Sequence, residues 1–523
     1  MRNKKFKIIN FLPYIISIGF LLIAISQLND YGFNIDSKKN FFEGDENLNY
    51  ILNKKGNISA LFFQMHGAFF LMISSLFNLI LSDQFHLMNE ISSRFLVLPL
   101  LVSLFVIPLY FFLKKHFGYL VAMVSVLSLL SFPEFFGFVF NDLKDIPLVV
   151  FFSLSIMSFY EWTVTRKIKF LYLFFLSFGL TLSIKIYAIV IVPILFIWCF
   201  MMPSNKIKLK DLFEENKSYF LIGLLIVFLL VAVLYMPAFW GMGNKMDFIQ
   251  KLIHDLKDVS VNDYSGWNYY SFMFIFFKTP LPMLFFAFLG LYITFKKRRK
   301  SLFLLLLLWM LIPALILCMP KTVRYFHGLR LFLVFIVPFS IIVSIGFKRF
   351  YVFVLQKTKL NKQLSLILLV FCLLFGNIFA IASTHPYETL YFNELVGGLG
   401  GAQKNKVISS FDYWLTSYKE AGVWINKNAA PLSTISLFYV SFYPFELYNF
   451  FDSYLVRKDL EIKRFFQLES INMLPSMSYI VYIPLDQYRF MTAENQLKNN
   501  FEYKPVYKIS RQGGEVLTIY YKI

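Results

Sequence analysis

Asp36 is a residue of this 523-residue chain whose position suggests chemistry, because it lies in the loop NIDSKKNFFEGDENLNY (34–50) that follows the first apolar run. A carboxylate that is tethered near a lipid surface, with aromatic neighbours that exclude water, could act as a general base. Asp45 and Glu46 lie in the same polar loop and compete for this role. A solvated acid without a catalytic role is the alternative for each of them.

A second polar segment, FNDLKDIP, lies between two later apolar runs. It places four polar side chains within five residues: Asn141, Asp142, Lys144 and Asp145. Asn or Asp before a helix, acids in its first turn and Pro147 near its start are typical of an N-terminal cap. Capping is compatible with a catalytic role, because a helix N-terminus also attracts phosphate.

Two further segments bring cations beside aromatic residues. In YSGWNYYSFMFIFFKTPLP, Lys278 follows Trp267 and Tyr270 and precedes an apolar run. These residues could be a snorkelling lysine with interfacial anchors, or a phosphate-binding cation beside an aromatic platform for a sugar.

The segment PKTVRYFHGLR carries four basic groups: Lys321, Arg324, His327 and Arg330. A lipid-linked phosphate is the simplest reason for them, because arginine binds phosphate through a planar fork. Structural ion pairs are the alternative.

No pattern in the chain specifies a metal site. Oxygen ligands near 36–46 and 141–145 could hold a divalent ion, but no spacing requires one. The three cysteines all lie in apolar runs: Cys199, Cys318 and Cys372. The sequence therefore predicts neither a disulfide framework nor a cysteine metal centre.

The apolar runs that must position these residues predict an α-helical polytopic membrane protein. The chain is 58% hydrophobic and its mean hydropathy is +0.61, and a bilayer-crossing helix needs about 20 apolar residues. We expect eleven transmembrane helices, near 8–27, 94–113, 119–137, 146–162, 169–184, 186–203, 218–238, 280–296, 302–319, 331–347 and 364–383. Lys185 is costly inside a bilayer, so it is expected in a turn between two short helices.

Alternate loops are basic, which sets the topology. Lysine and arginine are enriched at 114–116, 165–169, 206–210, 296–300 and 348–362. Such an excess marks the cytoplasmic side. The N-terminus is thus expected in the cytoplasm of a cell whose plasma (inner) membrane holds the chain, and every polar segment described above is expected outside. The net charge of +20 is assigned to anchoring beside membrane lipids and not to binding nucleic acid.

Three longer segments are expected on the outer side. Residues 28–93 form the first outer loop, and the apolar stretch 59–81 with His66 inside it predicts helices lying along the membrane surface. Residues 239–279 form the second outer segment. From 384 the composition becomes polar, which predicts a membrane domain over 1–383 and a small extracytoplasmic α/β domain over 384–523.

That α/β domain shows local patterns. The spacing predicts a helix over 418–429, strands over 434–440 and 478–484, a short helix over 493–501 and a final hairpin around Gly513 and Gly514.

Taken in order, several segments resemble the protein O-mannosyltransferase-like branch of the polytopic type C glycosyltransferases. They are NIDSKKNFFEGDENLNYIL, QMHGAFF, the span from Ser92 to Gly118, FNDLKDIP, WNYYSFMFIFFKTPLP, RYFHGLRLFLVFIVP, HPYETLYFNELVGG and FDYWLTSYKEAGVWIN. Ser37 and Lys38 replace an acid-Pro pair of that branch, so only Asp36 carries over from the first loop. His66 matches a family histidine, but the two prolines that follow it in the family are missing.

The resemblance implies a type C fold and an inverting transfer of a hexose or pentose from a polyprenyl-phosphate donor to a hydroxyl of a glycan, lipid or protein. Asp36 would be the base. Lys278, Arg324 and Arg330 would hold the donor phosphate, and Asp145 with Lys144 would orient the site. The supporting residues would be Asp45, His66, Asn141, Asp142, Trp267, Tyr270 and His327. The sequence assigns no cofactor and leaves a divalent metal ion as an open alternative.

Two other classes of protein fit parts of the sequence. A transporter or lipid flippase predicts charges in mid-span and inverted repeats, and only Lys185 approaches the first pattern. A membrane-anchored binding protein predicts that 384–523 carries the function and that Asp36 tolerates change.

Overall fold

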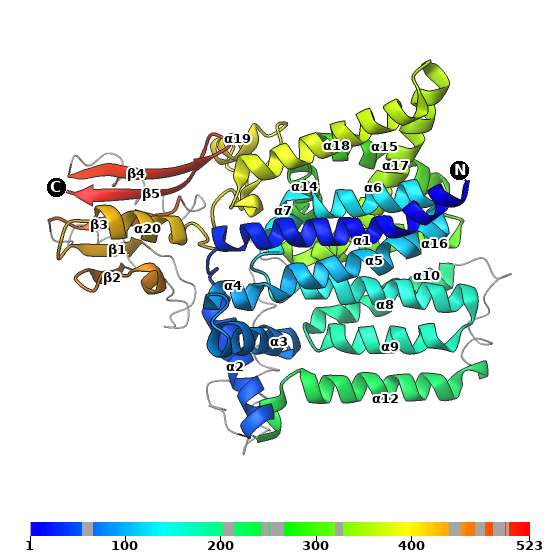
Figure 1. Ribbon diagram of the computed structural model, residues 1–523, viewed down its shortest axis with the longest axis horizontal. Helices are drawn as coiled ribbons and strands as arrows, with labels where there is room; N and C mark the ends of the chain where they lie inside the picture. The colour runs from blue at the N-terminus through cyan, green and yellow to red at the C-terminus, as the bar shows by residue number, and fades with distance from the viewer. Residues whose placement is uncertain are drawn as a thin grey trace.

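A bundle of apolar helices with a small sheet at one end makes up the protein (Figure 1). The computed structural model describes residues 2–54, 66–201, 214–241, 250, 266–319, 328–438, 451–465, 476–484, 497 and 502–523. The bundle helices are α1 (Arg2–Gln27), α5 (Val97–Phe117), α6 (Tyr119–Leu130), α8 (Asp145–Thr165), α9 (Ile168–Leu182), α10 (Ile191–Met201), α12 (Lys217–Leu234), α15 (Leu281–Lys296), α16 (Ser301–Ile316), α17 (Ile336–Lys357) and α18 (Lys362–Thr384).

Each of the eleven predicted spans falls on one of these helices, so the expected α-helical membrane architecture is confirmed. Within the described residues, six helices are long and apolar enough to cross a membrane, by length and composition alone. The number of actual crossings stays a prediction. The expected break at Lys185 is present, because α9 ends at Leu182 and a 3-10 turn, η4 (Ile186–Val190), precedes α10.

Small residues allow the bundle helices to approach closely. A Cβ atom on Gly290 of α15 would collide with the carbonyl oxygen of Ile342 on α17, and one on Gly346 would collide with that of Phe286. Lipid provides no hydrophobic drive for helices to associate, so such close backbone packing is a main source of their cohesion.

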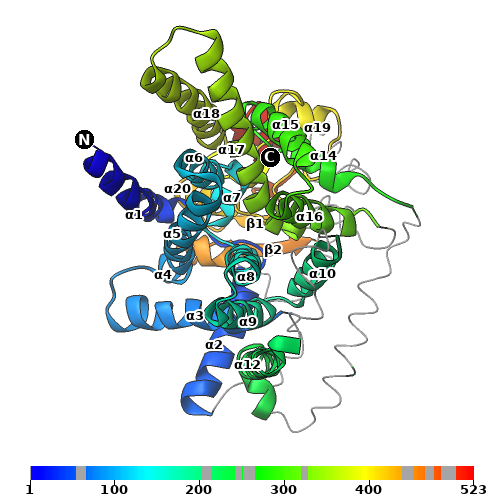
Figure 2. The same cartoon turned by 90° about the vertical axis from the view of Figure 1, so that its right-hand side faces the viewer.

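The first long loop folds into helices on the side of the sheet. In it, α2 (Ser37–Asn53) runs across the bundle axis (Figures 1 and 2), and its placement along a membrane surface stays a prediction. Next, α3 (Phe69–Asn78) packs closely on α2, since a Cβ atom on Gly44 would lie 2.6 Å from the Leu71 oxygen. The short helix α4 (Glu90–Phe95) leads into α5. Residues 59–65 of the predicted stretch 59–81 lie outside the described residues.

The C-terminal region forms a five-stranded sheet with the order β2-β1-β3-β5-β4. Its strands are β1 (Thr434–Phe438), β2 (Glu461–Phe465), β3 (Tyr479–Tyr482), β4 (Tyr503–Arg511) and β5 (Gly514–Lys522). The first three are parallel, and β5 runs antiparallel to β3 and β4. The predicted strands at 434 and 478, the hairpin, and the helix α20 (Tyr418–Asn428) are confirmed, whereas β2 was not predicted. The predicted helix at 493–501 lies almost wholly outside the described residues.

The two ends of the bundle differ. The N-terminus and the turn between α17 and α18 lie at the end far from the sheet (Figure 1). The sheet, α2 and the short helix α7 (Pro133–Phe138) lie at the other end. The basic turns and the polar segments are thus separated along the bundle axis. Which end faces the cytoplasm stays a prediction.

Candidate active site

Arg330 connects the predicted first-loop acid to the predicted second-loop acid. Its Nη2 atom donates to Asp36 Oδ2 at 2.7 Å, and its Nε atom donates to Asp145 Oδ2 at 2.9 Å. Lys144 Nζ lies 3.3 Å from the same Asp36 oxygen. Two carboxylates and two cations from three separate polar segments thus meet in one cluster.

The start of α8 holds the acidic half of this cluster. Asp142 Oδ1 accepts hydrogen bonds from the backbone N–H groups of Lys144 and Asp145, but the residue at the N-cap position of α8 is Lys144, whose side chain makes no capping hydrogen bond. Asp145 Oδ1 accepts a hydrogen bond from Lys185 Nζ at 2.7 Å, and its side chain is only 1% exposed. Lys185, which was expected in a turn, therefore neutralises the charge of Asp145.

Local hydrogen bonds fix the position of Asp36 just before α2. The Asn34 side-chain oxygen accepts from the Asp36 N–H at 2.9 Å, and the Asn34 amide donates to the Asn141 carbonyl at 2.7 Å. The Ile35 N–H donates to the Trp414 carbonyl at 3.0 Å. The loop is thus anchored both to the turn before α8 and to the C-terminal region.

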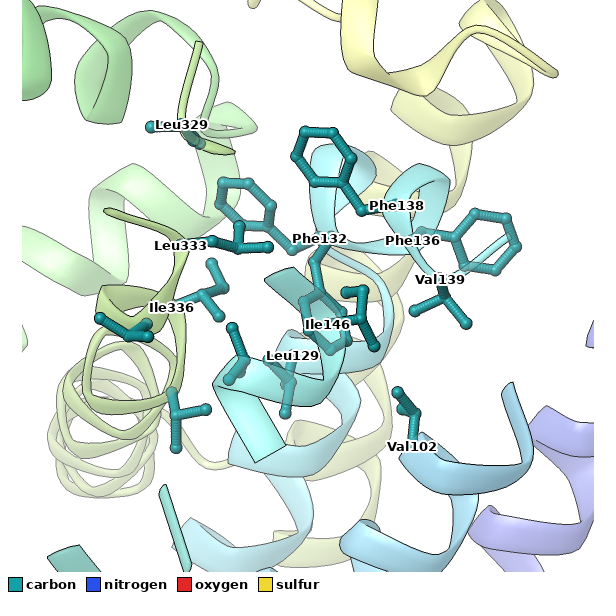
Figure 3. Packing of buried hydrophobic residues seen from close by; sticks show 14 of the residues in the cluster. Val102, Leu129, Phe132, Phe136, Phe138, Val139, Ile146, Leu329, Leu333 and Ile336 are labelled. Carbon is teal, nitrogen blue, oxygen red and sulfur yellow. The ribbon is translucent and has the colours of Figure 1, made fainter. Parts of the chain in front are cut away.

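Aromatic and apolar residues adjoin the charged cluster. The Arg330 guanidinium lies 4.6 Å above the Trp414 ring, an arrangement that stabilises a desolvated cation. Phe138, Ile146 and Leu329 belong to the buried cluster whose packing Figure 3 shows, and Ile146 and Leu329 are direct neighbours of Asp145 and Arg330. The charged side chains therefore project from a rigid core.

Charge is balanced within the cluster. Three carboxylates (Asp36, Asp142 and Asp145) face three cations (Lys144, Lys185 and Arg330). Burial would raise the pKa of Asp36, but Lys144 and Arg330 outweigh burial and hold this pKa well below its usual value. Burial raises the pKa of Asp142, and the Asp145 charge adds to this effect. A bound anion could pair with the cations that now pair with these carboxylates.

Lys278 lies apart from these contacts. Its side chain is fully buried, and its Nζ atom donates to the Thr389 carbonyl at 2.6 Å and lies 4.1 Å from the Phe392 ring centroid. The charge of the buried Glu134 acts on it. Glu134 also accepts from the Leu329 N–H at 3.0 Å, directly beside Arg330. Lys278 is thus connected to the cluster through Glu134 and does not contact it.

Asp45 belongs to a different ion pair. Both of its oxygens accept from Arg94, each at 2.9 Å, and the guanidinium lies over the Phe41 ring. Arg94 also pairs with Glu90 of the same helix. This arrangement tethers α2 to α4 and gives Asp45 a structural partner that Asp36 does not share.

His66 lies within electrostatic reach of the cluster. Burial, followed by the charges of Lys144 and Lys185, holds the pKa of His66 well below its usual value. Trp267 is exposed, whereas Tyr270 begins α14 (Tyr270–Phe277) and packs against the core. The predicted residues Lys321, Arg324 and His327 lie outside the described residues.

Sequence reasoning missed several members of the site. Glu43 is buried on α2 seven residues after Asp36 and pairs with Lys39 at 3.7 Å. A spacing of seven places it on the face that carries Asp36, so this signal was readable. Lys185 was noticed only as a turn residue. Nothing in the sequence pointed to Glu134 or to the role of Trp414. Across the described part of the chain, no group of three His, Cys, Asp or Glu residues could hold a metal ion.

Three comparisons with known proteins bear on these observations. The chain can be superposed on the crystal structure of ArnT from Cupriavidus metallidurans in the apo state with a TM-score of 0.48 and 12% identity, over 96% of this chain and 97% of that chain. No curated protein matches the chain. Residues 70–236 match the model of the dolichyl-phosphate-mannose-protein mannosyltransferase family. This family match confirms the resemblance read from the sequence, and the matched residues include Asp142, Lys144, Asp145 and Lys185.

Proposed function

We propose that the chain is a membrane glycosyltransferase that moves a sugar from a polyprenyl-phosphate donor to an acceptor hydroxyl on the extracytoplasmic face. The observation that carries this proposal is the meeting of Asp36, Lys144, Asp145 and Arg330 at the sheet end of the bundle. A base and phosphate-binding cations are what such a transfer needs, and the family match over 70–236 supplies the donor class.

The reaction is a single displacement at the anomeric carbon. The acceptor oxygen forms its bond to that carbon while the bond from the carbon to the phosphate oxygen breaks. The hydroxyl proton passes to the Asp36 carboxylate, and the polyprenyl phosphate leaves with one additional negative charge. A single displacement inverts the anomeric configuration.

The cations serve the leaving group. Negative charge grows on the phosphate as its bond to the sugar breaks, and preorganised cations that face such growing charge lower the barrier. Arg330 and Lys144 already converge on one carboxylate oxygen of Asp36. A donor phosphate that draws these two cations away from Asp36 also weakens the field that depresses its pKa. The base therefore becomes stronger when the donor is bound.

Asp145 has a positioning role in this scheme. It holds Arg330 on one side and Lys185 on the other, at 2.9 and 2.7 Å. Removing it would leave both cations without their shared anchor. Lys278 and Arg324 stay proposed phosphate ligands, and Lys278 acts in this scheme from beside Glu134.

The direct experiment uses the purified full-length chain in detergent. It is incubated with polyprenyl phosphate linked to mannose, glucose or arabinose, and with acceptors of glycan, lipid and peptide type. Transfer is followed by mass spectrometry, and the anomeric configuration of the product by NMR. A retained configuration would contradict the single displacement.

A transporter or flippase is the rival class. Lys185 is the one charged residue whose position favoured this class. It pairs with Asp145 and lies between the end of α9 and the start of η4. Movement of polyprenyl-phosphate sugars across vesicles that hold the purified chain, without any transfer to acceptors, would favour that class.

A further inference from the structure

Several buried polar atoms around the charged cluster have no hydrogen-bond partner among the residues that the structure describes. They are the Tyr187 hydroxyl, the Trp414 indole nitrogen, Asn141 Oδ1 and Asp142 Oδ2. Nearly all buried polar atoms in folded proteins are hydrogen-bonded, and the exceptions require an explanation. A missing ligand is one such explanation.

The residues that carry these atoms lie beside the cluster and come from three parts of the chain. Asn141 and Asp142 form the turn before α8, and Asp142 Oδ2 lies 3.4 Å from Arg330 Nε. Trp414 is 1% exposed and lies beneath the Arg330 guanidinium. Tyr187 follows Lys185 by two residues, and its hydroxyl lies within electrostatic reach of Asp145. These atoms thus adjoin the groups proposed to hold the phosphate, and Asp142 Oδ2, which forms an ion pair with Arg330, has no hydrogen bond within the described residues.

We propose that these four atoms form a subsite for the hydroxyl groups of the transferred sugar. The indole N–H donates, the two side-chain oxygens accept, and the tyrosine hydroxyl can do both. A sugar presents several neighbouring hydroxyls, each of which donates and accepts, so a mixed set of this kind fits it. This inference rests on the proposed function and adds the part of the donor that is recognised.

The decisive variant is Tyr187→Phe, because it removes one oxygen atom that has no partner within the described structure. Loss of this hydroxyl breaks no hydrogen bond among the described residues, so the variant is expected to fold like the wild type. Its KM for the polyprenyl-phosphate sugar that the wild type transfers should rise about two- to tenfold, the effect of one neutral hydrogen bond. Inhibition by sugar-free polyprenyl phosphate should not change.

Tyr391→Phe is the matched control. The Tyr391 hydroxyl is also buried without a partner among the described residues, but it lies just after η8 (Glu388–Leu390), and the acid whose charge acts on it is Glu394. This variant should keep the wild-type KM. The same logic pairs Trp414→Phe with Trp309→Phe, since the Trp309 indole nitrogen is also buried and has no hydrogen-bond partner in the described part of the chain.

Donors that lack single hydroxyls identify the contact. The wild type should discriminate against one monodeoxy donor, and Tyr187→Phe should lose that discrimination. Equal KM values for wild type, Tyr187→Phe and Tyr391→Phe would overturn the subsite while leaving the transferase intact. An equal loss of affinity for the donor and for sugar-free polyprenyl phosphate would assign Tyr187 to the phosphate instead. Absence of any transfer by the wild type would overturn the proposed function, and the subsite with it.

Discussion

Arg330 Nη2 lies 2.7 Å from Asp36 Oδ2 and joins two residues that are 294 positions apart. The contact connects the loop after α1 to the segment that enters α17, so only the folded bundle can form it. Both side chains are largely buried, at 9% and 22% exposure. In this pairing the proposed base and a proposed phosphate ligand hold each other until a substrate separates them.

Asp36→Asn should reduce sugar transfer about 10²- to 10⁴-fold, the usual contribution of general-base catalysis. The amide keeps the shape of the carboxylate and loses the proton acceptor. Expression and insertion should persist. The initial rate of transfer, measured with purified protein at saturating donor, tests this.

Asp45→Asn is the control for that variant. Arg94 binds both carboxylate oxygens of Asp45, so Asp45→Asn should lower the stability of the protein and have a smaller effect on the rate of sugar transfer. A dead Asp45→Asn enzyme beside an active Asp36→Asn enzyme would move the base to Asp45.

Arg330→Ala should both destabilise the protein and raise the KM for the donor. The substitution leaves Asp36, Asp142 and Asp145 with two cations in place of three. Breaking a buried ion pair lowers the free energy of unfolding by about 3–5 kcal/mol. Arg330→Lys should recover only part of the activity, because one ammonium cannot reproduce the planar fork that now spans Asp36 and Asp145. Thermal unfolding and donor KM are the two measurements.

Arg94→Lys gives the matched comparison, since Arg94 forms a similar fork on Asp45 away from the cluster. It should lower the melting temperature without changing the donor KM. A comparable KM defect in Arg94→Lys would show that the effect of Arg330 is only structural.

Topology can be tested by single-cysteine labelling in a variant without native cysteines. Positions in the basic turn 296–300 should react only from the cytoplasm, and positions near Asn405 only from outside. The reason is the separation of basic turns and polar segments to opposite ends of the bundle, together with the tendency of cationic loops to stay inside. Labelling of both sites from one side would reject this orientation and the extracytoplasmic placement of the site.

The sequence was sufficient to predict the helices of the bundle because a run of about 20 apolar residues has few other stable forms in lipid. The break at Lys185 was predictable for the same reason, since a bilayer opposes a lone charge. Strand β2 was missed because three of the five residues of EIKRF are charged, so this edge strand has no strong apolar signal.

The site was only partly predictable. Residue types identified Asp36, Asp145 and Arg330 as candidates, but the partner of each depends on how helices far apart in sequence pack. Lys185 pairs with Asp145 across 40 residues, and no local pattern encodes that contact. The Trp414 ring packs against Arg330, although Trp414 lies in the region that was predicted to be a separate domain. The site therefore contains residues from both sides of the predicted boundary at residue 384.

Glu43 makes the stability of the protein depend on pH. Burial and the Asp36 charge raise the pKa of Glu43 to about 7, although Lys39 and Lys144 oppose this. Its ordinary value is about 4.3. Between these two values the folded state binds a proton that the unfolded state has lost, so stability is greatest below the ordinary pKa. It should fall by roughly 3 kcal/mol as the pH rises to about 7 and then level off.

Glu43→Gln should remove this component, because the amide does not titrate and still fits the buried position on α2. The melting temperature of wild type in detergent, measured between pH 4.5 and 8, should therefore fall more steeply than that of Glu43→Gln. Parallel curves for wild type and Glu43→Gln would mean that Glu43 is ionised throughout this range. Its burial near Asp36 would then be balanced by Lys39, with no net effect of pH on folding.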